Sequence, residues 1–218
     1  ENSASTFEAL FHRMVEVNEH LNLTAITDED GVILKHFVDS VAISPFLPQG
    51  ARIADIGCGG GFPSLVIAIL RPDVSVFSVD SVSKKVAYVE STARLFGLSN
   101  ESVSNERAEV LGQGENRESF DIVTARAVGR LNLISELCLP LVKVGGAFLA
   151  MKAISTDEEL AEAKNAIELL GGSVENVFSY TLTDGSEQIE RSIVVIRKTK
   201  NTPLKYPRNN SQIAKKPL

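Results

Sequence analysis

Short runs of β-branched and aromatic residues alternate with helical stretches from residue 52 to residue 170. Strands are expected at Arg52–Ile56, Val74–Val79, Ser102–Asn105, Phe120–Thr124 and Ala147–Met151. Helices are expected between and after them at Pro63–Leu70, Val82–Phe96, Leu131–Leu141 and Asp157–Leu170. Because this alternation is typical of βαβ units, the sequence predicts an α/β fold whose parallel sheet is covered by helices on both faces.

Two more strands are expected at Val174–Thr181 and Ile189–Ile196, separated by a turn at Asp184-Gly185. Since no helix connects them, they should pair antiparallel. Five parallel strands that end in such a hairpin resemble the Rossmann-like sheet of class I S-adenosylmethionine-dependent methyltransferases. This likeness concerns the fold alone.

The first fifty residues are predicted to be helical. Apolar residues recur at helical spacing from Phe7 to Leu21, and a second helix is expected to start at the acidic cluster Thr27–Asp30, which suits a helix N-terminus. That helix would turn Val32, Ile33, His36 and Phe37 inward. Prolines and a glycine then break the chain before residue 51, which predicts an N-terminal helical extension (1–48), a main domain (49–198) and a basic tail (199–218).

Composition excludes several classes of protein. The 218 residues are 44% hydrophobic and 23% charged, as in an ordinary soluble protein. The longest apolar run, Leu65–Leu70, is far shorter than the roughly 20 residues of a membrane-spanning helix. The two cysteines, Cys58 and Cys138, have neither disulfide-framework nor metal-ligand spacing, so we expect no metal site and a reducing, cytoplasmic location. An organelle stays an alternative, because the chain begins at Glu1 and a leader could have been removed.

Charge is divided unevenly along the chain. The formal net charge is −6, but residues 197–218 hold seven basic and no acidic residues. Such a tail can reach a polyanion that the acidic body repels on average. The alternative is a solvated C-terminus whose lysines only keep it soluble.

A glycine-rich segment, Asp55 to Pro63, joins the first strand to the following helix. Its glycines stand at positions 57, 59 and 61, whereas a dinucleotide-binding loop would have its third glycine at position 62, which here is Phe62. Close backbone approach without a phosphate nest suits S-adenosylmethionine. A tight strand-to-helix turn without a ligand is the alternative.

Polar residues follow the other expected strands. Asp80 ends the second strand, where a carboxylate can accept hydrogen bonds from ribose hydroxyls or cap the next helix. Ala108 and Glu109 follow the third strand, Arg126 the fourth and Lys152 the fifth. Because the carboxyl ends of parallel strands share one edge, where ligands bind in open α/β sheets, these residues should converge.

The order of these motifs resembles the bacterial small-subunit ribosomal RNA (guanine-N7) methyltransferases, the glucose-inhibited division protein B family. The resemblance covers nearly the whole chain. It rests on Asn22-Leu23-Thr24, Lys35–Ser40, Asp55–Pro63, Asp80-Ser81, Lys84-Lys85, Arg107–Glu109, Ala125–Val128, Met151-Lys152 and Tyr206-Pro207-Arg208 with Lys215 and Pro217-Leu218. The chain departs from the family pattern at Lys35, Ser64, Ala153, Ser211 and Ile213.

The resemblance implies methyl transfer from S-adenosylmethionine to N7 of one guanine in 16S ribosomal RNA. It places cofactor contacts on Gly57, Phe62, Ala108, Glu109 and Arg126, and with the motifs above the full expected set is Gly57, Gly59, Gly61, Phe62, Asp80, Ala108, Glu109 and Arg126. Arg126 is also the catalytic candidate, with an ion pair to a carboxylate such as Glu109 as its alternative. Expected RNA contacts are Lys152, Lys205, Arg208 and Lys215. The partner would be 16S RNA or the small subunit, with the enzyme a monomer.

Guanine N7 carries a lone pair and no proton, so its methylation needs positioning rather than a base. His36 and Asp39, three residues apart on one helix face, are expected to form a local bonded pair, with a role in substrate binding as the alternative. Removing all residues after Ile196 should weaken RNA binding and leave cofactor affinity nearly unchanged. Two other functions stay open: a class I methyltransferase for a small molecule or protein, and a non-catalytic ribosome-assembly factor. A nicotinamide-dependent dehydrogenase is disfavoured by the glycine spacing.

Overall fold

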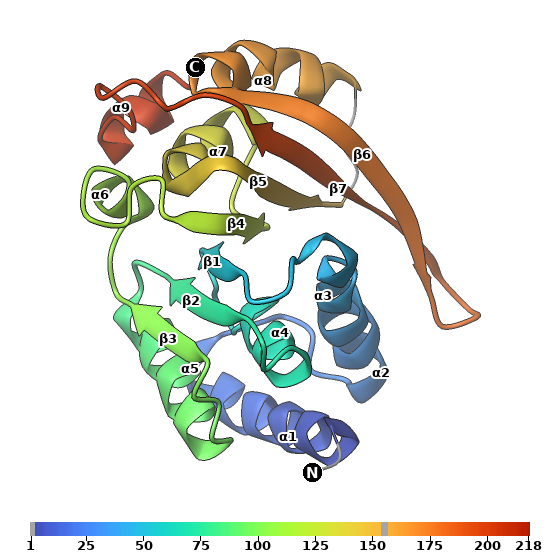
Figure 1. Cartoon of the computed structure of the whole chain (residues 1–218). Coiled ribbons are helices and arrows are strands. Elements are labelled where there is room, and N and C mark those ends of the chain that lie inside the picture. Colours follow the sequence, from blue (N-terminus) through green and yellow to red (C-terminus); the bar gives the residue numbers. More distant parts are fainter. Residues whose placement is uncertain (1–2, 154–156) are drawn as a thin grey trace.

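The computed structural model describes residues 3–153 and 157–218, in which seven strands form one sheet of order β3-β2-β1-β4-β5-β7-β6 (Figure 1). The strands are β1 (Arg52–Ile56), β2 (Ser75–Val79), β3 (Glu101–Ser104), β4 (Phe120–Arg126), β5 (Val142–Lys152), β6 (Gly172–Thr183) and β7 (Gln188–Lys198). The first five are parallel, while β7 pairs antiparallel with both β5 and β6. The predicted five parallel strands and terminal hairpin are confirmed.

Helices cover both faces of the sheet, as predicted. One side carries α1 (Ser3–Leu21), α4 (Ser64–Leu70) and α5 (Ser83–Leu95), and the other carries α6 (Ala108–Leu111), α7 (Leu131–Cys138), α8 (Asp157–Leu169) and α9 (Asn210–Lys215) (Figure 1). Short 3-10 turns lie at Ser44–Phe46 (η2) and Leu139–Leu141 (η3). The sequence analysis missed α6 and α9. None of the helices in the described residues is long and apolar enough to span a bilayer.

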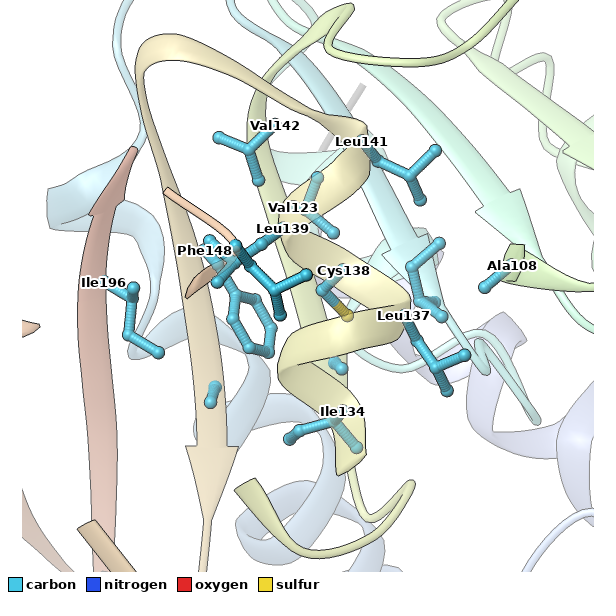
Figure 2. Packing of buried hydrophobic residues seen from close by; sticks show 14 of the residues in the cluster. Ala108, Val123, Ile134, Leu137, Cys138, Leu139, Leu141, Val142, Phe148 and Ile196 are labelled. Carbon is cyan, nitrogen blue, oxygen red and sulfur yellow. The ribbon is translucent and has the colours of Figure 1, made fainter. Parts of the chain in front are cut away.

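Alternate residues of each central strand face opposite halves of the core. In β1, Ala54 and Ile56 join the cluster under α7, while Ile53 joins the cluster on the other side. Figure 2 shows the first cluster, where Ile134, Leu137 and Cys138 of α7 lie among Phe148 of β5 and Ile196 of β7. Packing on both faces holds the carboxyl ends of β1, β2 and β4 in a fixed relation.

The second predicted helix is divided into three pieces. Asp28 caps α2 (Glu29–Val32) through the N–H of Gly31 at 2.7 Å, as its acidic start suggests. A π-helical segment, η1 (Ile33–Val38), follows and leads into α3 (Asp39–Val41). The wider turn rotates the side chains out of regular α-helical register. Val32, His36 and Phe37 are buried as predicted, but the inward placement of Ile33 is wrong, since it is 42% exposed.

Candidate functional site

In the loop after β1, glycine is required by the backbone conformation and by a side chain that lies close to the loop. Gly57, Gly59 and Gly61 have φ values of +73°, +56° and +83°. The N–H groups of Gly57 and Cys58 both donate to the carbonyl of Val79, which ties the loop to the end of β2. A Cβ on Gly57 would lie 2.7 Å from Cγ2 of Val128. The loop therefore presents bare backbone to the space beside Val128.

Asp80 holds the loop and the start of α5 together. Its Oδ2 accepts from the N–H of Gly59 at 3.1 Å, and its Oδ1 accepts from the N–H of Val82 at 2.9 Å. The helix-cap alternative for Asp80 is wrong, because the N-cap of α5 is Val82 and no side chain caps this helix. Each carboxylate oxygen can accept a second hydrogen bond, so the expected ribose contact stays compatible with this geometry.

A cavity of about 290 Å³, here called the small cavity, opens at the carboxyl ends of β1 and β2. Four of the predicted cofactor residues line it: Gly57, Asp80, Ala108 and Glu109. Its other lining residues are Ile56, Val79, Ser81, Glu106, Arg107, Val128, Leu133, Leu137 and Asn210. Gly59, Gly61, Phe62 and Arg126 are not among them. The sequence analysis missed the walls supplied by α7 and Asn210.

Asp55 lies beneath the glycine loop with an unsatisfied oxygen. Its Oδ2 accepts from the N–H of Ser64 at 3.3 Å, whereas the buried Oδ1 has no partner among the described residues. Burial, opposed by its hydrogen bonds with Ser64, raises the pKa of Asp55 to about 6. A buried carboxylate without a full set of donors can accept from a cationic or N–H-bearing ligand placed above it.

A second cavity, of about 800 Å³, lies at the carboxyl ends of β4 and β5. Five basic side chains line this basic cavity: Lys35, Arg126, Arg130, Lys152 and Arg191. Its remaining lining residues are Ile26, His36, Asp39, Ala127, Gly129, Met151, Ala153 and Glu159. The predicted convergence of Arg126 and Lys152 at one edge is thus present, although they lie in a different cavity from Asp80.

Arg126 is held by groups of the N-terminal region. Its Nη1 donates to the carbonyl of Lys35 and to Oδ2 of Asp39, both at 3.0 Å. The guanidinium carbon lies 5.6 Å from the centre of the Phe62 ring, which supports it from below. The alternative considered for Arg126, an ion pair with a carboxylate, is therefore present, but its partner is Asp39 and not Glu109, which accepts from Nε of Arg107 at 2.6 Å. Phe62 therefore supports Arg126 without lining either cavity.

His36 is buried between Phe62 and Arg126. Its ring stacks on Phe62 with centroids 4.7 Å apart, and Nη2 of Arg126 lies 3.3 Å from its Nδ1. Nδ1 also lies 3.1 Å from the carbonyl oxygen of Lys35, and Nε2 lies 2.8 Å from Oγ1 of Thr24, so both ring nitrogens have hydrogen-bond partners. Burial and the neighbouring Arg126 charge lower the His36 pKa to about 4, so the ring is neutral at pH 7. The predicted bonded pair of His36 and Asp39 is wrong: Arg126 lies between them.

Asp39 joins α3 to the terminal hairpin. Its Oδ1 accepts from the hydroxyl of Tyr180 in β6 at 2.8 Å and lies 3.6 Å from Nε of Arg191 in β7. Tyr180 and Arg191 are direct cross-strand partners. The sequence analysis missed both residues. It predicted that β6 pairs with β7, but it did not predict that this hairpin contacts the N-terminal region.

The four residues predicted to contact RNA differ in their surroundings and in their ion pairs. Nζ of Lys152 donates to the carbonyl of Gly129 and pairs with Glu159 at 2.7 Å, at the wall of the basic cavity. Lys205 and Lys215 are exposed, with Lys205 against the Tyr206 ring. Arg208 is engaged by the buried carboxylate of Glu136, with Nη2 at 2.6 Å. Its guanidinium anchors the C-terminal segment, and its contact with RNA stays a prediction.

One turn lies between the two cavities. Arg126, Ala127 and Gly129 line the basic cavity, whereas Val128 lines the small cavity. Ala127 and Gly129 have φ values of +57° and +156°, so the turn reverses sharply at the end of β4. A ligand in the small cavity and a ligand in the basic cavity would thus both lie against this turn. Within the described residues, no group of three or more His, Cys, Asp or Glu is placed to hold a metal ion.

Comparison with known proteins agrees with this arrangement. The family model described as rRNA small subunit methyltransferase G (GidB) matches residues 3–190. The ribosomal RNA small subunit methyltransferase G of Lactobacillus delbrueckii subsp. bulgaricus is 49% identical over 218 residues, covering 97% of this chain and 90% of that protein. That of Bacillus subtilis is 47% identical over 215 residues, covering 97% and 89%.

A solved SAM-dependent O-methyltransferase from Thermotoga maritima has the same fold, with a TM-score of 0.54, 18% identity, and coverage of 87% of this chain and 73% of that one. At that identity the likeness concerns architecture alone. The family match extends over the glycine loop, the turn at residues 126–129 and all lining residues of the two cavities except Arg191 and Asn210. The chain belongs to the rRNA small subunit methyltransferase G family.

Proposed function

We propose that this protein transfers a methyl group from S-adenosylmethionine to N7 of a guanine in 16S ribosomal RNA. The observation that carries the proposal is the turn at residues 126–129, which separates a small cavity with a bare glycine wall from a larger, basic one. Family membership supports the reaction class. The position of the turn supports transfer between a donor on one side and an RNA base on the other.

The residues of the small cavity fit the cofactor. Gly57 presents bare backbone at the cavity wall, where a Cβ would collide with Val128, and the Asp80 carboxylate has the acceptor capacity for two ribose hydroxyls. Apolar side chains of Val79, Leu133 and Leu137 suit a flat ring. Bound there, S-adenosylmethionine supplies an electrophilic methyl group on a sulfonium centre.

The basic cavity fits an RNA nucleotide. Arg126 has five N–H donors, of which the contacts with Lys35, Asp39 and His36 take only part, so its planar fork can also bind O6 of guanine or a phosphate. Lys35, Arg130, Lys152 and Arg191 add positive charge around the same space. On the outer surface, Lys205 and Lys215, with Arg208 between them, are the proposed phosphate contacts of the C-terminal segment.

The protein's task in this reaction is to position the base. N7 has a lone pair and no proton, so no group needs to remove one. His36 is consistent with this, because its ring is neutral at pH 7 and both ring nitrogens already have hydrogen-bond partners. Holding nucleophile and methyl group in line while excluding water can contribute about 7–11 kcal/mol. We further propose that the enzyme acts as a monomer in the cytoplasm on 16S RNA or the small subunit.

The test compares Arg126→Lys with the wild type. Lysine keeps the charge but loses the planar fork, so the rate of methyl transfer should fall at least about tenfold. The substrate is small-subunit RNA from cells that lack the modification. Thermal melting should change little. Mass spectrometry of nuclease-digested RNA reads out N7-methylguanosine, and Arg94→Lys on exposed α5 is the matched control.

Three outcomes contradict the proposal. Equal rates for the two variants would remove Arg126 from the reaction. A methylated protein or small molecule with unmodified RNA would establish a different acceptor. Wild-type protein that binds RNA but neither S-adenosylmethionine nor its demethylated product would support an assembly factor instead. A loss of thermal stability in Arg126→Lys would show a structural role through Asp39.

A further inference from the structure

The C-terminal segment, residues 199–218, forms part of the wall of the small cavity. Asn210, the first residue of α9, lines the cavity together with Asp80, Glu109 and Leu137. In Figure 1, α9 lies beside α6 and α7, the two helices that supply the other residues on this side. A segment that the charge pattern marks as a solvated or RNA-binding tail thus reaches the proposed cofactor site.

Buried contacts fix this segment in place. The Glu136 carboxylate, 0% exposed on α7, accepts from the backbone N–H of Arg208 at 2.8 Å and from its guanidinium at 2.6 to 3.2 Å. Tyr206 and Ile213 belong to the core cluster that also contains Leu137 and Ala108. Because Glu136 is adjacent to Leu137 on α7, the helix that lines the cavity also holds the segment.

The two neighbouring asparagines of the segment differ in their bonding. Oδ1 of Asn209 caps α9 by accepting from the N–H of Gln212 at 3.0 Å. The carboxamide of Asn210 has no hydrogen-bond partner among the described residues. It therefore has a free acceptor and free N–H donors at the rim of the cavity.

The position of Asp80 indicates which end of the cofactor would lie beside Asn210. Asp80 is expected to hold the ribose, and the methyl-bearing end must lie toward Val128, whose neighbours Ala127 and Gly129 line the basic cavity. The space left for the adenine ring lies among Ala108, Leu133, Leu137 and Asn210. An adenine edge offers one donor, the 6-amino group, and one acceptor, and a carboxamide complements both.

We propose that Asn210 binds the adenine edge of the cofactor, so that the C-terminal segment is a specificity-determining part of the cofactor site. This inference rests on the proposed function, because it assumes an adenosine-containing cofactor in the small cavity. The Glu136–Arg208 pair is the positioning device, since it sets where Asn210 stands.

Calorimetric titration with S-adenosylhomocysteine tests the inference on the full chain. Asn210→Ala should raise the dissociation constant roughly five- to tenfold, the range of one or two neutral hydrogen bonds. Gln212→Ala, exposed on the same short helix and outside the cavity lining, is the matched control and should bind like the wild type. Both substituted side chains are exposed, so both variants should melt with the wild type.

A second titration uses the analogue of S-adenosylhomocysteine in which hydrogen replaces the 6-amino group, so that the donor is lost and the ring nitrogens stay acceptors. The wild type should prefer the adenosine compound, and Asn210→Ala should lose most of that preference. Unchanged affinity in folded Asn210→Ala, or an equal loss for both compounds, would overturn the assignment of Asn210 alone. If the wild type binds neither compound, the proposed cofactor is wrong, and this inference fails with it.

Discussion

At the scale of single residues, the carboxylate of Asp39 connects four elements. It stands on α3, accepts from Arg126 of β4 and Tyr180 of β6, and lies within ion-pair distance of Arg191 of β7. The nearby Asp39 charge and burial raise the pKa of Tyr180, so its hydroxyl stays protonated and donating. Two arginines of the basic cavity are thus oriented by one carboxylate.

Tyr180→Phe should slow methyl transfer while leaving the fold intact. The substitution removes one hydrogen bond to a charged group, typically worth roughly 1.5–3 kcal/mol, and lets Asp39 and Arg126 move. We expect a lower single-turnover rate with little change in the dissociation constant for S-adenosylhomocysteine. Ser179→Ala, exposed on the same strand, is the control. Equal rates for both variants would show that Tyr180 does not position Arg126.

At the scale of elements, neighbouring strands bring acidic groups into the same buried face. Register pairs Asp55 of β1 with Ser78 of β2, and Oγ of Ser78 donates to Oε1 of Glu101 in β3 at 2.5 Å. The other oxygen, Oε2, is buried without a partner among the described residues. Burial raises the Glu101 pKa to about 8, and the charge of Asp55 adds to the effect.

Stability should therefore fall as pH rises. A carboxyl whose pKa is raised in the folded state binds more protons there than in the unfolded chain. The contribution of Glu101 to the free energy of unfolding is therefore complete below about pH 4.5, its pKa in the unfolded chain, and is lost as the pH rises through 8. Asp55 acts in the same direction up to about pH 6.

Glu101→Gln mimics the protonated form and should reduce this pH dependence. Melting temperatures measured from pH 5 to pH 9 should decline less in Glu101→Gln than in the wild type. Glu168→Gln, exposed on α8, should keep the wild-type slope. Parallel curves for all three proteins would contradict the protonated state of Glu101.

At the scale of the whole molecule, the C-terminal segment is integral to the fold. Lys198 is fully buried, and its Nζ donates to the carbonyls of Leu139 and Val142 and to Oγ1 of Thr202 while pairing with Glu118 at 3.1 Å. The Arg117 guanidinium binds the carbonyls of Thr202 and Tyr206. Because these contacts lie in the core, we now expect that removing everything after Ile196 would destabilise the fold, and the predicted loss of RNA binding has to be measured on variants that keep residues 197–206.

Lys198→Met should destabilise the protein by about 3–5 kcal/mol, because it leaves Glu118 and two carbonyls without their donor. For a chain of this length that corresponds to roughly 6–20 °C in melting temperature. Lys200→Met removes the same charge two residues later from an exposed position and should melt within a few degrees of the wild type. Similar melting of the two variants would show that the buried pair contributes little.

Local sequence patterns were sufficient to predict the sheet and the glycine loop. The spacing of glycines 57, 59 and 61 and the carboxylate of Asp80 depend on neighbours in sequence, and parallel strands bring their ends together by geometry alone. The family likewise followed from the order of short motifs. These features are encoded within a few residues of one another, so the linear order of the chain is enough to predict them.

Only the tertiary structure decided which distant groups meet. Arg126 bonds residues about ninety positions away, Arg208 pairs with Glu136 rather than projecting as a free cation, and the π-helical turn exposes Ile33. Basic residues after position 196 look alike in sequence, yet Lys198 is buried and Lys200 is not. Such differences depend on packing across the whole chain, because a charge is buried only where a partner from another element can compensate its lost hydration.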